Sequence, residues 1–352
     1  MIRPDQKRIS RIVDDHGRIV SETNARGQTT TYVYDVAGRV TKISPPGAFA
    51  DTSIVYWSTG NGLKQTITRG NSRTVTTYDG FIRPILVQAM DLTGHSPARY
   101  TKTRYDALGR TVFASFPSHS PNPTTGVDTS YDALGRVTQV RETVAPYATT
   151  RTAYLSGNKV QVTDPIGART TTTYQAWGAP STVQASLIQQ TLGMTTSMTY
   201  DAWGNLTSAS QGGVTQTWTY DSRFRLCNHF TPEQNGTVYA YDNANQVTYM
   251  ARGQGTGCSS NAADRIHYTY DAMGRQTLIN FPAGTTDISK TYDANGNLLT
   301  SKRGGVNWTY AYNELDLLTQ ETLRIDGRTY ETSHGYNTTG HLSSMNTPSG
   351  TG

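Results

Sequence analysis

Short runs of β-branched and aromatic residues, separated by turn-forming residues, recur along the whole chain. Thr29–Tyr34 and Arg136–Val140 are two examples. Runs of this kind predict β-strands. No segment keeps a helical period over a useful length; Ser186–Leu192 comes nearest and is too short to change the interpretation. The pattern therefore predicts an all-β protein of short strands and tight turns.

Many of these strands end in a repeated motif, in which Tyr-Asp is followed by two variable residues, a Gly and often an Arg. Successive tyrosines lie mostly 20 to 27 residues apart. The clearest copies and close variants contain Tyr34, Asp35, Gly38, Arg39; Tyr105, Asp106, Gly109, Arg110; Tyr131, Asp132, Gly135, Arg136; Tyr200, Asp201, Gly204; Tyr270, Asp271, Gly274, Arg275; and Tyr292, Asp293, Gly296. Weaker copies begin at Val13, Tyr78, Tyr174, Tyr220, Tyr241, Tyr312 and Tyr336, and Tyr56 and Tyr154 fall where copies are due.

One repeat is expected to form a β-hairpin followed by a turn into the next hairpin. The Asp carboxylate can accept backbone N–H bonds two residues on, and the Gly can take a positive φ that other residues resist. Second turn signals follow, as at Pro45–Gly47. About 15 such hairpins make residues 1–352 a single array. A sheet of that many strands must curl, which predicts a long curled or spiral β-sheet ribbon that forms a partial or complete hollow shell.

Two positions of the motif carry further expectations. The residue before the Gly varies widely, and we expect it to pack over the neighbouring hairpin. Exposed Trp side chains there could instead be platforms for sugar stacking. The Arg after the Gly is expected to pair with the turn Asp of its own or an adjacent copy, in a ladder along the ribbon. The residues before the Gly are Ala37, Leu108, Leu134, Trp177, Trp203 and Met273.

Composition supports a thin wall and argues against several other classes of protein. Only 35% of the 352 residues are hydrophobic, which is little for a compact ball of this size. The net charge is +5, but the basic residues are dispersed, so nucleic-acid binding is not expected. No apolar stretch reaches the ~20 residues of a membrane span, and the first ten residues contain no apolar core of a signal peptide.

No catalytic, cofactor-binding or metal-binding constellation stands out. The chain lacks a Gly-x-Ser-x-Gly elbow, a His-Glu-x-x-His motif and a phosphate-binding loop, and its seven histidines are scattered. Cys227 and Cys258 lie 31 positions apart and could form a disulfide, but they do not indicate a compartment. We therefore expect no enzyme. Inserted loops near 81–104, 113–130 and 242–269 are candidate places for binding.

The Tyr-Asp-x-x-Gly-Arg unit at this spacing strongly resembles the Rhs/YD-repeat family over residues 9–345. The family includes Rhs polymorphic toxins, the C component of insecticidal toxin complexes, wall-associated bacterial proteins and teneurins. Asp164–Gly167 also matches the family's way of entering a repeat. The resemblance implies a hollow β-shell around a toxic C-terminal domain. The family's closing Asp-Pro-x-Gly-Leu-x-Gly-Gly-like segment is not found, so self-cleavage is not carried over, and we expect a partial shell.

The leading hypothesis is a non-catalytic shell segment that encapsulates or presents a toxin or effector in an Rhs-type secretion system. Such a chain would be secreted or lie at a bacterial cell surface, exported by dedicated machinery. Its expected partners are the cargo or adjoining shell regions, and exposed strand edges favour self-association. The alternative is an extracellular adhesion or carbohydrate-binding module that uses exposed Tyr and Trp side chains.

Overall fold

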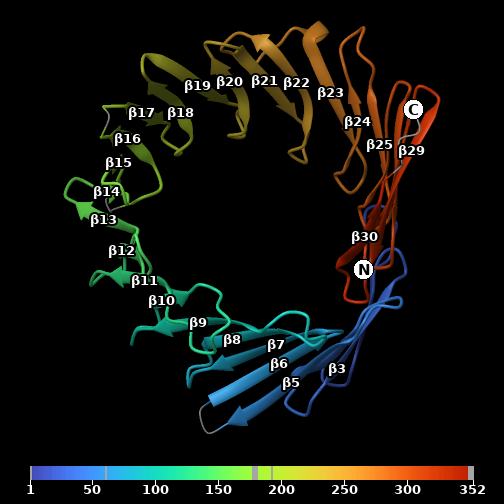
Figure 1. The fold of residues 1–352 in the computed structure, drawn as a ribbon. Coiled ribbons are helices and arrows are strands. Elements are labelled where there is room, and N and C mark those ends of the chain that lie inside the picture. Colours follow the sequence, from blue (N-terminus) through green and yellow to red (C-terminus); the bar gives the residue numbers. More distant parts are fainter. Residues whose placement is uncertain (1, 60–61, 177–180, 192, 348–352) are drawn as a thin grey trace. The chain divides into compact units, whose positions relative to one another are not determined.

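The computed structural model describes residues 2–59, 62–176, 181–191 and 193–347 (Figure 1). It confirms the all-β fold, with 30 strands and, within the described residues, a single 3-10 turn at Ala262–Asp264 as the only helical element. The chain divides into two compact units: unit 1 consists of Met1–Ala98 and Ile266–Gly352, and unit 2 of Arg99–Arg265. Among the described residues, no helix has the length and apolar character needed to cross a membrane.

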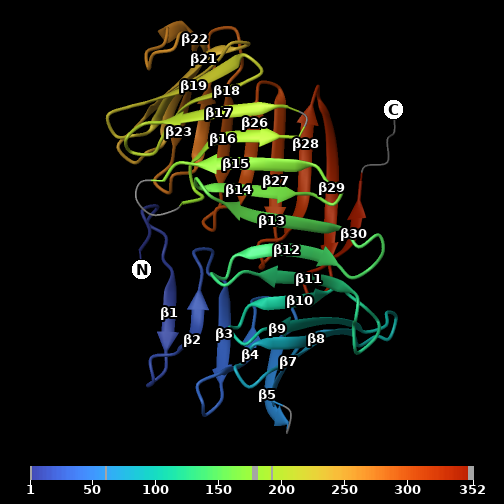
Figure 2. The same ribbon diagram turned by 90° about the vertical axis from the view of Figure 1, so that its left-hand side faces the viewer.

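Unit 2 is an antiparallel meander, in which each strand pairs with the strands next to it in the chain. Figure 2 shows β11 to β16 following one another in this order. Hairpin turns enforce this topology because they leave too little chain for any other pairing. The strands are β9 (Arg99–Tyr105), β10 (Thr111–Ser115), β11 (Gly126–Tyr131), β12 (Val137–Glu142), β13 (Thr149–Leu155), β14 (Lys159–Thr163), β15 (Arg169–Tyr174), β16 (Ala185–Gln190), β17 (Thr195–Tyr200), β18 (Leu206–Gln211), β19 (Val214–Tyr220), β20 (Leu226–Thr231), β21 (Asn235–Tyr241) and β22 (Val247–Gln254).

Unit 1 contains two runs of consecutively paired antiparallel strands, one from each end of the chain. The first run is β1 (Ser10–Val13), β2 (Ile19–Thr23), β3 (Thr29–Tyr34), β4 (Val40–Ser44), β5 (Thr52–Thr59), β6 (Gly62–Arg69), β7 (Ser72–Tyr78) and β8 (Pro84–Asp91). The second is β23 (Arg265–Tyr270), β24 (Gln276–Asn280), β25 (Ile288–Tyr292), β26 (Leu298–Arg303), β27 (Val306–Tyr312), β28 (Leu318–Ile325), β29 (Arg328–Tyr336) and β30 (Leu342–Asn346).

The hairpin turns fall on two opposite sides of the strands. We call the side that carries the Tyr-Asp turns the YD edge, and the side that carries the other turns the return edge. In many hairpins the strand register shifts at the motif Tyr, as between Ser130 and Tyr131. Such a shift is typical of a type I turn followed by a left-handed residue and a β-bulge. The motif therefore determines the end and the register of its hairpin.

Few apolar side chains are fully buried in the part of the chain that the structure describes. Most strand positions are half-buried, as the thin hydrophobic composition predicts. Three of the five buried apolar residues lie together on β20, β21 and β22, which indicates that contacts between neighbouring repeats matter more than a central core. The buried apolar residues are Ile54, Phe113, Cys227, Val238 and Ala251.

Candidate functional site

The Tyr-Asp turn is a closed hydrogen-bonded loop, and the copy at Asp132 shows its geometry. Oδ1 of Asp132 accepts the backbone N–H groups of Leu134 at 3.0 Å and Arg136 at 2.9 Å. The N–H of Gly135 donates to the Asp132 carbonyl oxygen at 3.0 Å, and Gly135 has φ +80°. Nε of Arg136 donates to Oδ2 of Asp132 at 2.7 Å. One carboxylate therefore organises the whole turn, and the Gly provides the left-handed residue that closes it.

The Asp and Arg of a motif form an ion pair within their own turn. The side chain and then the backbone N–H of Arg136 lower the pKa of the Asp132 carboxyl below its ordinary value of 3.8. Exposed pairs of this kind contribute little each, so their main effect is to hold the turn in one conformation. At Asp201 and Asp293 the Asn four residues on donates in place of the Arg. The same ion pair occurs at Asp14–Arg18, Asp35–Arg39, Asp79–Arg83, Asp106–Arg110, Asp221–Arg225 and Asp271–Arg275.

The motif also joins each repeat to the next one. The hydroxyl of Tyr131 donates to the carbonyl oxygen of Thr111 at 2.7 Å, and Thr111 directly follows the motif Arg of the preceding repeat. The guanidinium of that residue, Arg110, lies 4.6 Å from the centroid of the Tyr131 ring and donates to the Asp132 carbonyl oxygen at 3.4 Å. The Tyr is thus held at its face by a cation–π contact and at its tip by a hydrogen bond.

This link between repeats recurs along both units, and reasoning from the sequence did not anticipate it. The Asp–Arg ladder was expected, but the role of the Tyr hydroxyl was not. Its acceptor is a backbone carbonyl group, which every residue type has, so the sequence does not identify it. The hydrogen bonds are Tyr34 to Ile19, Tyr131 to Thr111, Tyr154 to Val137, Tyr200 to Ala185, Tyr220 to Leu206, Tyr241 to Leu226, Tyr292 to Gln276, Tyr312 to Leu298 and Tyr336 to Leu318.

The motif residues therefore meet as chains of neighbours and do not converge on one pocket. The structure keeps Tyr105 and Tyr270 at the ends of β9 and β23, at the same place in their hairpins as Tyr131. Within the described residues, no group of three or more His, Cys, Asp or Glu side chains is placed to hold a metal ion. The arrangement can brace a sheet mechanically.

The expectation for the variable position before the Gly is wrong in several copies. Leu108, Leu134 and Trp203 are 76%, 78% and 74% exposed, and Ala37 is also exposed. Trp203 contacts Phe224 of the next Tyr-Asp turn, with ring centroids 5.1 Å apart, but this contact leaves most of the Trp203 side chain exposed. Met273 is half-buried. Trp177 lies outside the described residues, and sugar stacking on Trp203 stays a prediction.

In unit 1 the YD edge of the C-terminal strands is covered by the return edge of the N-terminal strands. Arg26, in the turn between β2 and β3, donates to the carbonyl oxygen of Asn313 at 3.0 Å. Its guanidinium also pairs with Asp316 at 2.6 Å and with Asp293 at 3.4 Å. Burial acts to raise the pKa of Asp293, but hydrogen bonds from Asn297 and the positive charge of Arg26 lower it overall. One guanidinium thus joins two turns of the opposing edge.

Further contacts extend this stacking of edges. The N–H of Ala50, in the turn before β5, donates to the Thr338 carbonyl oxygen at 2.7 Å. Arg3 donates to the carbonyl oxygen of Ala294 at 2.6 Å. Leu315 and Leu317 line one hollow together with Ile43, Pro45 and other residues. Leu315 occupies the same position in its turn as Leu134 does, and it is half-buried here, with the adjacent turn at Gly340 and the return edge at Ile43 and Pro45 both close to it.

The turn that carries Arg26 was missed in the sequence. Oδ1 of Asn24 accepts the N–H groups of Arg26 and Gln28, and the N–H of Gly27 donates to the Asn24 carbonyl oxygen. This is the Tyr-Asp turn without its Tyr, on the return edge. Asp164–Ala168 folds in the same way. The spacing of an Asx residue and a Gly three positions later was the available signal.

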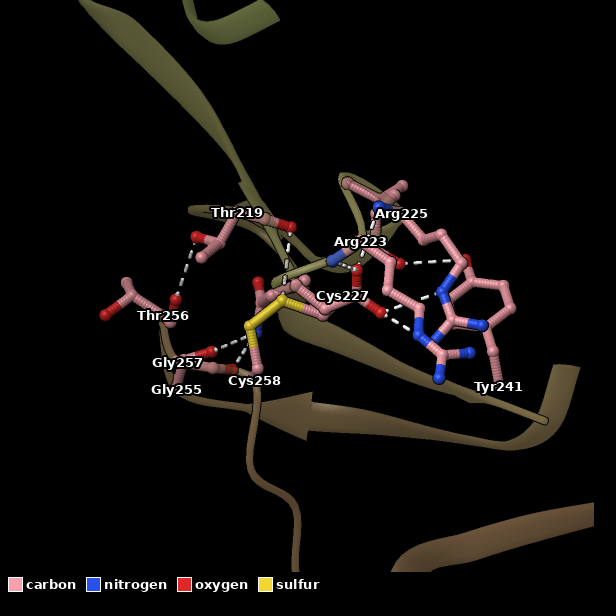
Figure 3. The surroundings of a disulfide bond; sticks show 12 residues. Thr219, Arg223, Arg225, Cys227, Tyr241, Gly255, Thr256, Gly257 and Cys258 are labelled. Carbon is pink, nitrogen blue, oxygen red and sulfur yellow. Dashed lines mark hydrogen bonds and ion pairs between the residues drawn. A yellow bond between two sulfur atoms is a disulfide. The ribbon is translucent and has the colours of Figure 1, made fainter. Parts of the chain in front are cut away.

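Within unit 2, a disulfide fastens the loop that follows β22 to strand β20 (Figure 3). Cys227 on β20 is bonded to Cys258, and the Cα atoms of the two residues are 5.1 Å apart. Beside the disulfide, Nδ2 of the fully buried Asn228 donates to the carbonyl oxygens of Gly255 at 2.8 Å and Gly257 at 2.6 Å. A Cβ at Gly236 would collide with the Gly255 carbonyl oxygen. The region near 242–269 was expected to be an inserted loop, but much of it forms strands β22 and β23, and only the segment between these two strands is a loop, which these contacts hold in place.

Comparisons with known proteins agree with this architecture. The family model described as RHS Repeat matches residues 13–49 and 292–329, one segment in each half of unit 1. The match confirms the resemblance drawn from the sequence, and these two segments are RHS repeats. No curated protein matches the chain.

Solved structures share the fold. The crystal structure of TcdB2-TccC3-Cdc42 matches with a TM-score of 0.55 and 17% identity, over 98% of this chain and 22% of that chain. The crystal structure of TcdB2-TccC3-TEV matches with a TM-score of 0.54 and 16% identity, also over 98% and 22%. The chain thus spans less than a quarter of the length of the structures it matches, and at this identity the likeness concerns the fold.

Proposed function

We propose that this chain is a non-catalytic wall segment of a β-shell that encloses or presents a toxin or effector cargo. The observation that carries the proposal is the stacking in unit 1, where the return edge of one run of strands packs against the YD edge of another. Stacked edges let a ribbon of hairpins grow into a continuous wall. The Tyr and Arg contacts between repeats brace that wall along its length.

Two further observations support the proposal. The repeats match the RHS Repeat model, and the fold matches that of the structures of TcdB2-TccC3. The mechanism is steric, because a wall of paired strands keeps proteases and host molecules away from what it encloses. We extend this to a role in an Rhs-type secretion system, with the chain secreted or at a bacterial cell surface.

Protease protection tests the proposal. The chain is purified from its native source without denaturant, and every polypeptide that stays with it is identified by mass spectrometry. We expect an accompanying polypeptide, joined or separate, that resists protease until mild denaturant opens the repeats. A matched sample of that polypeptide alone should be digested at once. Equal digestion rates with and without the repeats would show that they do not act as a wall.

A further inference from the structure

The YD edge of unit 2 carries a row of exposed apolar side chains. Leu108, Leu134 and Trp203 occupy the same position in three Tyr-Asp turns of this edge, and all three are about three-quarters exposed. Phe224 lies at the tip of the next turn after Trp203, and the two ring centroids are 5.1 Å apart. Large apolar side chains gathered along one edge are typical of an interaction surface. The wall function alone gives no reason for them.

The return edge of the same unit is also apolar at its tips. Ile166 is 91% exposed in the turn between β14 and β15. Tyr147 and Met194 are each about half exposed, in the turns before β13 and before β17. Unit 2 thus has two opposite apolar edges at the two ends of the same strands.

Unit 1 shows what covers a YD edge in this protein. There, Leu315 is the counterpart of Leu134, and it is half-buried against a return edge that contributes Ile43 and Pro45. Arg26 and the backbone N–H of Ala50 add polar contacts to the same surface. The occupant of a YD edge is therefore a return edge of RHS hairpins, and unit 2 has both kinds of edge exposed.

We propose that the YD edge of unit 2 docks the return edge of unit 2 from a second copy of this chain. Both edges run across the ends of the same strands. The return edge of a copy displaced along the strand direction therefore follows the same path as the YD edge that it meets. When that copy is also shifted by three strands, Ile166 lies opposite Leu134 and Tyr147 lies opposite Leu108, so the contact is heterologous. Heterologous contacts that do not close into a ring extend into filaments. The interface does not require a cargo, and it differs from backbone pairing at terminal strands because turn side chains make it.

Sedimentation velocity over a range of concentrations tests the proposal. The wild-type chain should self-associate reversibly, and Leu108→Ser with Leu134→Ser should raise the dissociation constant at least about tenfold, because two apolar side chains lose their burial. Ile166→Ser on the opposite edge should weaken association as well. The matched control is Val33→Ser with Val55→Ser, two exposed valines on strands β3 and β5. It should leave association unchanged, and circular dichroism should show that each variant is folded.

Crosslinking determines the geometry of the contact. Leu134→Cys and Ile166→Cys chains, mixed and treated with a short bismaleimide, should crosslink to each other far more than either variant does to itself. A chain that stays monomeric at all concentrations would overturn the proposal. So would association that the control weakens as much as the Leu108 and Leu134 variant does, or crosslinks that form only between identical variants.

Discussion

Removing the disulfide should destabilise unit 2 by several kcal/mol. The perturbation is the double variant Cys227→Ser, Cys258→Ser, whose partners are 31 residues apart. In the chain-entropy model, a crosslink that closes a loop of this length stabilises the folded state by about 3 to 4 kcal/mol, because it restricts the unfolded chain. The hydrogen bonds of Asn228 and the contact of Thr219 with Thr256 remain in the variant, so the loop should still dock.

The assay is urea unfolding followed by circular dichroism, with oxidised wild type, reduced wild type and the double variant in parallel. The two forms without the disulfide should lose the same free energy of unfolding, which separates loss of the crosslink from any effect of the serines. Hydrogen exchange should show faster opening of the loop 255–264 and of the strands below it, where Val238 and Ala251 are fully buried. A loss below about 1 kcal/mol, in both forms, would refute the entropic reasoning.

Three further predictions concern the turns. Tyr131→Phe leaves the Thr111 carbonyl oxygen without its donor and should cost about 1 kcal/mol in urea unfolding; Tyr147→Phe on the return edge is the control, and an equal loss there would contradict the role given to the repeat hydroxyl. Ile82 has φ +61°, so Ile82→Gly should raise stability by about 1 kcal/mol, and a loss would be the adverse result. The backbone N–H and then the side chain of Arg39 lower the pKa of Asp35. Its stabilisation is therefore present above the ordinary value of 3.8 and is lost as pH falls through the lower folded value; acid unfolding that Asp35→Asn leaves unchanged would contradict this.

The sequence was sufficient for the fold class because the signal is local. Each Asp-x-x-Gly turn fixes the end of a hairpin, and antiparallel pairing of neighbours follows from short connections. The sequence does not predict whether Cys227 and Cys258 form a disulfide, because a spacing of 31 residues does not determine whether two cysteines meet. The pairing of the two cysteines depends on the path of the loop around Gly255. The buried Asn228 side chain bonds this loop, and Gly236 has no Cβ that would collide with it.

The error about the variable position has a physical cause. Leu134 and Leu315 occupy the same place in the motif, yet one is exposed and the other is half-buried. Leu315 has the adjacent turn at Gly340 and a second edge at Ile43 and Pro45 close to it, and the presence of a second edge is a relation between residues far apart in the chain. A pattern read within one repeat contains no information about it.

The departures from the motif do carry some of that information. In regular repeats the motif Arg donates to the next Asp carbonyl oxygen, as Arg275 does to Asp293 at 2.7 Å. The following repeat has Asn297 in place of the Arg, so the next carbonyl group, that of Asn313, has no such donor within the ribbon. Arg26 from the stacked return edge donates to it instead, at 3.0 Å.

The stacked edge therefore supplies a guanidinium where the repeat lacks one. Asn297 is too short to span two turns as Arg275 does, and its Nδ2 bonds Asp293 at 2.8 Å and Asp316 at 2.8 Å. The shorter side chain leaves room for Arg26 to approach from outside. We therefore expect a motif with Asn in place of the Arg to indicate a turn on which a second edge stacks. In unit 2, the turn of the exposed Trp203 has this substitution, at Asn205. That turn lies within the edge to which the proposed second copy binds.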